Sequence, residues 1–223
     1  AGQSCIGAER VYVVESVAEE FIETIVDLAK KIKPGQSYGP ATMPSQLKVI
    51  QSHLDDAKAK GAKFLLGGPD SVKGAFVEPV IMVDVPEDST AMTQETFGPT
   101  LAINKVLNTD EAIKLSNASS YGLAAAVFSK REGEKIASKL ACGMVSINSV
   151  FLFAAIASVP FGGVKDSGYG RIHGGEGLLE YTYARSVVKT RFKIPLRFTT
   201  FKRTKFSEKI LTLLIKKLHG RRK

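Results

Sequence analysis

The chain of 223 residues shows two hydrophobic patterns in alternation along most of its length. Short runs rich in β-branched and aromatic residues are typical of strands, and they occur at residues 9–15, 63–66, 101–106, 123–128 and 144–147. Apolar residues spaced three and four apart are typical of amphipathic helices, and they occur at residues 16–32, 45–60, 109–117 and 130–141. This alternation predicts an α/β fold, in which a mostly parallel sheet carries helices on both faces.

Some segments interrupt this alternation. Residues 76–83 are rich in β-branched residues, but Pro79 predicts an edge strand or an interrupted one. Residues 86–95 are polar and are expected to be irregular. Residues 148–175 contain many glycines and are expected to form a loop, and residues 181–188 are expected to form the last strand.

The chain is expected to divide into three parts. Residues 1–180 carry the α/β pattern and are predicted to form one domain, residues 181–190 hold the last strand, and residues 191–223 form a tail. In the tail, Ser207 can cap a helix with one apolar face. The residues of that face are Ile210, Leu211, Leu214, Ile215 and Leu218.

The positive charge of the chain belongs to the tail. Residues 191–223 hold 12 Lys and Arg and one acid, a net charge of +11, whereas residues 1–190 hold 19 basic and 21 acidic residues, a net charge of −2. A basic amphipathic segment is compatible with peripheral contact to an anionic membrane, with docking on a partner subunit or with a solvated arm. No nucleic-acid recognition motif accompanies the charge, so binding of nucleic acid is not expected.

The chain has two cysteines, Cys5 and Cys142, and three histidines far apart in the sequence. The few cysteines and the lack of a signal-peptide pattern favour a reducing compartment, so we expect a cytoplasmic protein whose tail can associate with a membrane. The histidines have no cysteine or carboxylate at ligand spacing, and no metal site is expected. No apolar stretch has the length of a membrane span, and no glycine-rich phosphate loop follows a strand.

The first five residues, AGQSC, place the thiol of Cys5 near a flexible glycine. A cysteine nucleophile needs close approach to a carbonyl, which Gly2 permits, and a positive setting, for which Arg10 is the nearest cation in the sequence. A lone cysteine is more often a buried inert residue than a catalytic one, and Cys142 is expected to be of that kind. The downstream sequence therefore has to decide the role of Cys5.

Three motifs follow the thiol. They are Glu95–Pro99 (ETFGP), Gly143–Asn148 (GMVSIN) and Pro160–Arg171 (PFGGVKDSGYGR). Together with Gly2–Cys5 (GQSC), their order and spacing resemble the C-terminal, catalytic-domain half of an NAD(P)-dependent aldehyde dehydrogenase. Each motif is modest alone, but four of them in this order make a specific combination.

The resemblance covers roughly residues 1–190 and implies oxidation of an aldehyde to a carboxylic acid with NAD or NADP. It implies that Cys5 is the nucleophile, which forms a thiohemiacetal and then a thioester, and that its backbone N–H contributes to an oxyanion hole. Glu95 matches the glutamate that binds the nicotinamide ribose, and Phe97 matches the aromatic residue beside that ribose. The residues implied to line the substrate tunnel are Asn148, Phe153 and Phe161.

The resemblance also has implications for the rest of the protein. In relatives the strand that corresponds to residues 181–190 pairs subunits, so a dimer or tetramer is expected. Family members carry a dinucleotide-binding domain, a general-base glutamate and an oxyanion-hole asparagine before the nucleophile. This chain holds none of these, so Ala1 is expected to mark a cut in a longer enzyme and the chain alone to be inactive. Ile172 stands where many members have a glutamate after Gly170–Arg171.

Two other functions remain open on the sequence alone. A CoA-acylating aldehyde dehydrogenase would pass the acyl group to CoA in place of water. A non-catalytic structural or membrane-docking relative would keep the motifs without turnover.

Overall fold

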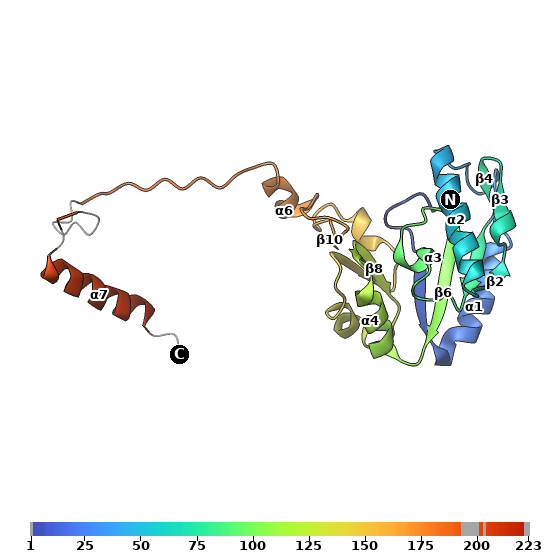
Figure 1. Cartoon of the computed structure of the whole chain (residues 1–223), viewed down its shortest axis with the longest axis horizontal. Helices are drawn as coiled ribbons and strands as arrows, with labels where there is room; N and C mark the ends of the chain where they lie inside the picture. Colours follow the sequence, from blue (N-terminus) through green and yellow to red (C-terminus); the bar gives the residue numbers. More distant parts are fainter. Residues whose placement is uncertain (1, 193–200, 203, 221–223) are drawn as a thin grey trace. The chain divides into compact units, whose positions relative to one another are not determined.

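The computed structural model describes residues 2–192, 201–202 and 204–220. It consists of two compact units, Ala1–Tyr183 and Ala184–Lys223, and each is described by itself (Figure 1). All four motifs lie in the first unit. Ala1 and part of the expected tail, at residues 193–200, 203 and 221–223, lie outside the described residues.

A four-stranded sheet forms the centre of the first unit. Its strands, in order across the sheet, are β1 (Arg10–Val14), β6 (Thr100–Val106), β5 (Val80–Val83) and β2 (Lys63–Leu66). β6 is parallel to both β1 and β5, whereas β2 is antiparallel to β5 at one edge. Val and Ile are frequent in these strands, and their stiff branched side chains suit a pleated surface. The sheet is therefore mostly parallel, as predicted.

Helices cover both faces of this sheet. They are α1 (Glu15–Ala29) and α2 (Pro44–Ala59). α1 packs on the face that carries Ile81 and Val83 of β5, and α2 packs on the face that carries Val80 and Met82. Because consecutive strand residues point to opposite faces, one strand contributes to two apolar cores. This arrangement confirms the predicted α/β fold.

The rest of the first unit is built from smaller pieces, and Figure 1 shows β8, β10 and α4 grouped on one side of β6 and α1, α2 and β2 on the other. Three further sheets have two strands each. In one, β8 (Ala124–Val127) is parallel to β9 (Met144–Ile147). In the other two, β7 (Tyr121–Gly122) is antiparallel to β10 (Val164–Lys165), and β3 (Val72–Lys73) is antiparallel to β4 (Phe76–Val77). The remaining helices are η1 (Pro69–Ser71), α3 (Thr90–Thr93), α4 (Thr109–Ala118), α5 (Gly133–Ala137), η2 (Leu152–Ala155) and α6 (Gly174–Leu179).

Of the segments that interrupt the alternation, the structure bears out one prediction and corrects two. The β-rich segment 76–83 is split by Pro79 into β4 and β5, so the interrupted strand is the correct alternative. The segment 86–95 contains the short helix α3, and the segment 148–175 contains η2 and β10. Local composition could not show these elements because contacts distant in sequence hold them.

The helix expected at residues 130–141 is much shorter in the structure, where α5 ends at Ala137. The side chain of Asn117, from α4, explains this end. Its amide nitrogen donates to the carbonyl of Lys139 at 2.8 Å, and its oxygen accepts from the N–H of Ala141 at 2.7 Å. These two backbone groups are thus bound to another element, and a longer helix would have to give up both bonds.

Residues 181–188 form no strand with the described part of the chain, contrary to the prediction. The N–H groups of Tyr181 and Thr182 instead close turns onto the carbonyls of Leu178 and Leu179. All eight residues are exposed. A strand needs a neighbouring strand for its backbone hydrogen bonds, and the part of the chain that the structure describes provides none for these residues. Pairing with a second subunit stays a prediction.

The described part of the second unit contains helix α7 (Lys205–His219). Thr204 caps it, not Ser207: the Thr204 hydroxyl accepts from the N–H of Ser207 at 3.2 Å, and the Ser207 hydroxyl accepts from the N–H of Thr204 at 3.1 Å. The helix therefore begins earlier than expected, and none of its residues is buried. Among the described residues, no helix has the length and apolar character needed to cross a membrane.

The partly buried carboxylate of Asp56 fixes the start of α3, which leads into the ETFGP motif. The Asp56 carboxylate of α2 accepts hydrogen bonds from the backbone N–H of Thr90 and the hydroxyl of Ser89, both at 2.7 Å. Lys60 lies 3.3 Å from the same carboxylate. These donors lower the pKa of Asp56 to about 2, with the Thr90 N–H contributing most.

We expect Asp56 to make stability depend on acid. Its pKa is lower in the folded chain than in the unfolded chain, so its contribution is complete above about pH 4 and disappears as pH falls toward 2. Asp56→Asn should therefore destabilise the chain near neutral pH, and this difference from wild type should shrink below about pH 4 and be lost as pH falls through about 2. Urea titrations across this range would measure it, with the exposed neighbour Asp55→Asn as control. An Asp56→Asn penalty that is equally large at both ends of the range would contradict the assignment.

Candidate active site

The first two motifs meet through a close backbone contact. Gly2 has a φ of +72°, and a Cβ atom there would lie 1.9 Å from the carbonyl oxygen of Gly98 in the ETFGP motif. Only glycine allows this approach, because any side chain would overlap with that backbone. The chain then turns at residues 4–7, where the N–H of Gly7 donates to the carbonyl of Ser4 at 2.9 Å, and the thiol of Cys5 is exposed.

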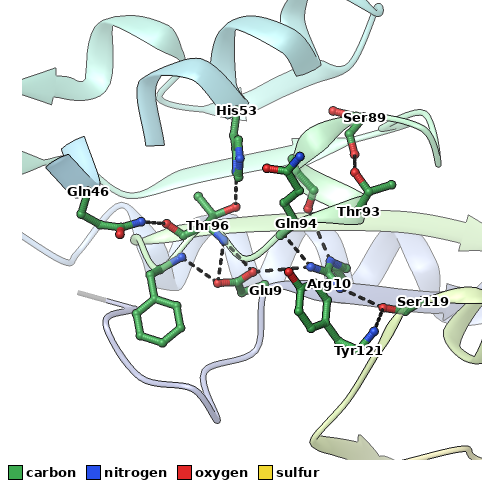
Figure 2. A network of polar contacts seen from close by, with 12 residues as sticks. Glu9, Arg10, Gln46, His53, Ser89, Thr93, Gln94, Thr96, Ser119 and Tyr121 are labelled. Atoms are coloured by element: carbon green, nitrogen blue, oxygen red, sulfur yellow. Dashed lines mark hydrogen bonds and ion pairs between the residues drawn. The ribbon is translucent and has the colours of Figure 1, made fainter. Parts of the chain in front are cut away.

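Glu9 ties the thiol segment to the same motif, as Figure 2 shows. Its carboxylate accepts hydrogen bonds from the N–H of Thr96 at 3.0 and 3.1 Å and from the N–H of Phe97 at 2.8 Å. The side chain of Glu9 is only 15% exposed, so these charge-assisted bonds are shielded from water. The carbonyl of Glu9 also accepts from the N–H of Ala102 in β6. The motif is thereby fixed relative to β1.

Helix α2 holds the motif from the opposite side. The amide of Gln46 donates to the carbonyl of Thr96 at 2.6 Å, and Nδ1 of His53 lies 3.1 Å from the Thr96 hydroxyl (Figure 2). His53 is buried, and this burial lowers the pKa of its imidazole, which favours the neutral ring as a hydrogen-bond partner. Thr96 is therefore bound through its N–H, carbonyl and hydroxyl at once.

Arg10 does not contact the thiol, contrary to the sequence expectation of a nearby cation. Its guanidinium donates to the carbonyl of Gln94 at 2.8 Å and to the Ser119 hydroxyl at 3.4 Å. It also lies 5.8 Å from the ring centre of Tyr121, in cation–π geometry (Figure 2). Arg10 opens β1, and its side chain points along the sheet edge toward β7. It therefore joins Gln94, directly before Glu95, to Ser119 and to Tyr121 of β7.

Glu95 and Phe97 face different surroundings although they are two residues apart. Glu95 is exposed, and its carboxylate makes no hydrogen bond with the described residues. Partial burial and the negative charge of Glu9 raise the pKa of Glu95, while Arg10 opposes that shift. Phe97 is half-buried with a φ of +50°, and it lines a cavity of about 10 Å³ together with Gln3 and Pro99. That space has room for about one water molecule and is packing space, not a substrate pocket.

The three residues expected to line a substrate tunnel lie outside the strands: Asn148 follows β9, Phe153 is in η2, and Phe161 precedes β10. The side chain of Asn148 is bound twice to Ser129: its oxygen accepts from the N–H at 2.9 Å, and its nitrogen donates to the carbonyl at 3.1 Å. Phe153 is buried, and its ring centre lies 6.2 Å from that of Phe161. Among the described residues, no hydrogen bond, ion pair or ring contact joins these three side chains to Cys5, Glu95 or Phe97.

The third and fourth motifs meet through glycines and hold their loop through backbone bonds. A Cβ atom at Gly143 would lie 1.9 Å from the carbonyl oxygen of Gly162. Lys165 donates to the carbonyls of Asn117 and Ser119 at 2.8 and 2.9 Å, and Arg171 donates to the carbonyl of Gly163 at 2.8 Å. Both cations thus stabilise the loop through carbonyl groups, not through the ion pairs that their charges would suggest.

The structure thus joins the first motif to the second and the third to the fourth. A comparison with known proteins tests whether the four motifs belong to one family. A sequence model described as the aldehyde dehydrogenase family matches residues 1–187, which is most of the chain and includes all four motifs. The chain belongs to the aldehyde dehydrogenase family. The resemblance found in the sequence is therefore confirmed.

Relatives of known name support this membership. A Mycobacterium ulcerans protein, provisionally named a succinate-semialdehyde dehydrogenase [NADP(+)], is 41% identical over 203 residues, which cover 86% of this chain and 39% of the relative. A 4,4'-diapolycopene aldehyde oxidase of Methylomonas is 38% identical over 87% of this chain and 38% of its own length. The chain thus spans about two fifths of the length of these relatives.

Solved structures of aldehyde dehydrogenases have the same fold over this region. Betaine aldehyde dehydrogenase of Staphylococcus aureus, solved with NAD+, matches with a TM-score of 0.79 and 33% identity, over 90% of this chain and 42% of that one. Aldehyde dehydrogenase 21 of Physcomitrella patens, solved with the reaction product succinate, matches with a TM-score of 0.70 and 36% identity, over 76% and 36%.

Sequence reasoning missed the residues that hold the candidate site together. Glu9 is the clearest case, since it contacts the second motif at a separation of 88 residues from Phe97. Gln46 and His53 were also missed, because on a helix they match ordinary surface and core positions. One signal was available for Glu9: the ETFGP motif lies outside regular structure, so its N–H groups need acceptors from elsewhere. Among the described residues, no group of three His, Cys, Asp or Glu could hold a metal ion.

Proposed function

We propose that the protein carrying this chain oxidises an aldehyde to a carboxylic acid with NAD or NADP, using Cys5 as nucleophile. One observation carries the proposal. The thiol of Cys5 is exposed, and so is the carboxylate of Glu95, which has no hydrogen-bond partner among the described residues. The two segments that carry them are fixed to each other by Glu9 and by the contact between Gly2 and Gly98. Reactive groups that are free on a rigid support are what a preorganised site requires.

The proposed chemistry begins at the thiol. The Cys5 thiolate forms a C–S bond to the aldehyde carbon, and the carbonyl oxygen becomes an alkoxide near backbone N–H donors. Loss of hydride from that carbon leaves a thioester on Cys5, which water cleaves to the carboxylic acid and the free thiol. When bound, NAD or NADP supplies the hydride acceptor.

Glu95 and Phe97 suit the cofactor roles that the resemblance gives them. A carboxylate accepts two hydrogen bonds from a ribose diol, and Glu95 has no competing donor among the described residues. Glu9 and Gln46 bind the backbone directly after this residue, and Arg10 binds the carbonyl of Gln94 directly before it, so the position of the carboxylate costs little ordering on binding. We propose that Phe97, held at positive φ, packs beside the ribose, and that Asn148, Phe153 and Phe161 contribute to the substrate passage.

The subunit arrangement is also a proposal. Residues 181–190 carry exposed backbone and large apolar side chains such as Tyr181, Tyr183 and Val187. An unpaired extended segment of this kind can add to the sheet of a second copy, which would make a homodimer or a tetramer.

A product assay on the protein expressed with its natural flanking sequence tests the function. Aldehyde should yield carboxylic acid and reduced nicotinamide with NAD or NADP and without CoA. Glu95→Ala should raise the KM for the cofactor by about tenfold or more, because it removes charge-assisted hydrogen bonds, while the exposed Glu20→Ala on α1 should not. A thioester product formed only with CoA would favour a CoA-acylating enzyme. Full-length protein without turnover on any aldehyde would favour a non-catalytic relative.

A further inference from the structure

Helix α7 (Lys205–His219) has two different faces. With about 100° per residue, its apolar side chains share one broad stripe. They are Phe206, Ile210, Leu211, Leu213, Leu214, Ile215 and Leu218, and Ser207 and Lys217 share the stripe with them near the two ends of the helix. The opposite stripe carries Lys205, Lys209, Thr212 and Lys216. The sequence therefore builds an amphipathic helix whose polar face is basic.

The apolar stripe of α7 is exposed to solvent. Leu213 and Leu218 are 67% and 72% exposed, and Leu214, near the centre of the stripe, is 40% exposed. Phe206 at the start of the helix is 68% exposed, and the aromatic ring of Phe201 just before it is fully exposed. A contiguous apolar surface of this kind is unfavourable in water and indicates a binding surface.

The charge around the helix restricts what can cover it. Residues 191–223 carry a net charge of +11, and Glu208 is their single acid. A neutral apolar groove would fit the stripe but would leave these charges without partners. A surface that is apolar inside and negative outside satisfies both, and an anionic bilayer has that structure, with lysines reaching the headgroups from the flanks of the helix.

We propose that α7 lies in the plane of an anionic lipid membrane, with its apolar stripe in the acyl boundary and its lysines at the headgroups. The 15 residues of the helix are about 22 Å long, short of a hydrocarbon core of about 30 Å, so the helix lies on the membrane and does not cross it. Phe201 and Phe206 occupy the interface, where aromatic rings are favoured. The proposal concerns the second unit and does not depend on the catalytic role of Cys5.

Vesicle sedimentation with the full chain tests the proposal. The vesicles contain about 30 mol% phosphatidylserine in phosphatidylcholine, and phosphatidylcholine alone is the reference. We expect binding to the anionic vesicles that weakens strongly when salt is raised from about 0.05 to 0.5 M. Equal binding to both kinds of vesicle, or none to either, would overturn the proposal.

Two variants separate lipid insertion from simple charge attraction. Leu214→Glu and Thr212→Glu add the same negative charge to the same helix, on the apolar and the polar face respectively. Thr212→Glu should weaken binding about fivefold through charge alone. Leu214→Glu should weaken it at least about tenfold further, because the leucine that inserts into the lipid is lost. Since no residue of α7 is buried, neither change should lower the melting temperature of the first unit.

The remaining outcomes point to other occupants of the stripe. Equal losses for Leu214→Glu and Thr212→Glu would mean that the apolar stripe stays in water, and this would overturn insertion. Concentration-dependent self-association without vesicles, abolished by Leu214→Glu, would mean that a second copy covers the stripe. Binding to a nucleic-acid duplex that matches the anionic vesicles in strength and survives Leu214→Glu would also overturn the proposal, because charge alone would explain it.

Discussion

Cys5→Ala is expected to lower aldehyde oxidation by the full-length protein by about 10⁴-fold or more. The reason is that no other group on these segments can form the C–S bond that carries the acyl intermediate. Binding of the cofactor, measured by fluorescence titration, should stay unchanged, because Glu95 and Phe97 are untouched. Activity of Cys5→Ala close to that of wild type would exclude Cys5 as nucleophile.

Cys142 provides a matched control in the same chain. Its thiol is half-buried, donates to the carbonyl of Met144 at 3.2 Å, and has a pKa raised by burial, so it is a poor nucleophile. Cys142→Ala should leave turnover unchanged. Brief alkylation of the folded chain followed by mass spectrometry should modify the exposed Cys5 well before Cys142. Faster labelling of Cys142 would contradict this reading of the two sites.

The second large effect is expected at Glu9. Glu9→Ala removes the acceptor of the Thr96 and Phe97 N–H groups and leaves Arg10 without its carboxylate neighbour at 3.8 Å. Unsatisfied buried donors and a broken, mostly buried charge pair together cost roughly 3 kcal/mol of unfolding free energy. Urea titration of the chain would measure this loss as a lower midpoint.

Glu9→Gln and Glu20→Ala are the comparisons for this variant. Gln keeps one acceptor oxygen, so Glu9→Gln should lose only about half as much stability. Glu20→Ala changes an exposed residue of α1 and should stay within about 0.5 kcal/mol of wild type. In the full-length protein, Glu9→Ala should also raise the KM for the cofactor, because it releases the backbone that presents Glu95. A Glu9→Ala chain as stable as Glu20→Ala would show that these hydrogen bonds contribute nothing.

The regular part of the fold could be predicted because its signals are local. The helical period of α1 and α2 and the β-branched runs of β1, β5 and β6 each act within a few residues. Elements fixed from a distance could not be predicted in this way. Asn117 ends α5 early and Asp56 fixes the start of α3, and each is distant in sequence from the helix end that it binds. The separation of β8 and β9 from the main sheet likewise depends on tertiary packing.

The candidate site divides along the same line. Cys5 and Glu95 were found from the motifs that contain them. Glu9 was missed, and Arg10 was expected near the thiol. The sequence of a charged pair at the start of a strand does not show which groups its side chains contact. The place of Asn148 beside a substrate tunnel stays a prediction, and the bonds of its amide to Ser129 are a contact that only the folded chain reveals.

The contact between Gly2 and Gly98 bears on how inactive descendants of this family would look. A side chain at Gly2 would meet the carbonyl of Gly98, and one at Gly98 would meet Ile50 at 2.8 Å, so both positions are closed to substitution for reasons of space. A copy that lost its chemistry would still need both glycines in order to fold. Cys5 and Glu95 are exposed and support no packing, so they could be exchanged at little cost in stability. In this architecture the glycines of the motifs are required by the fold, whereas the thiol and the carboxylate would be kept only for the proposed chemistry.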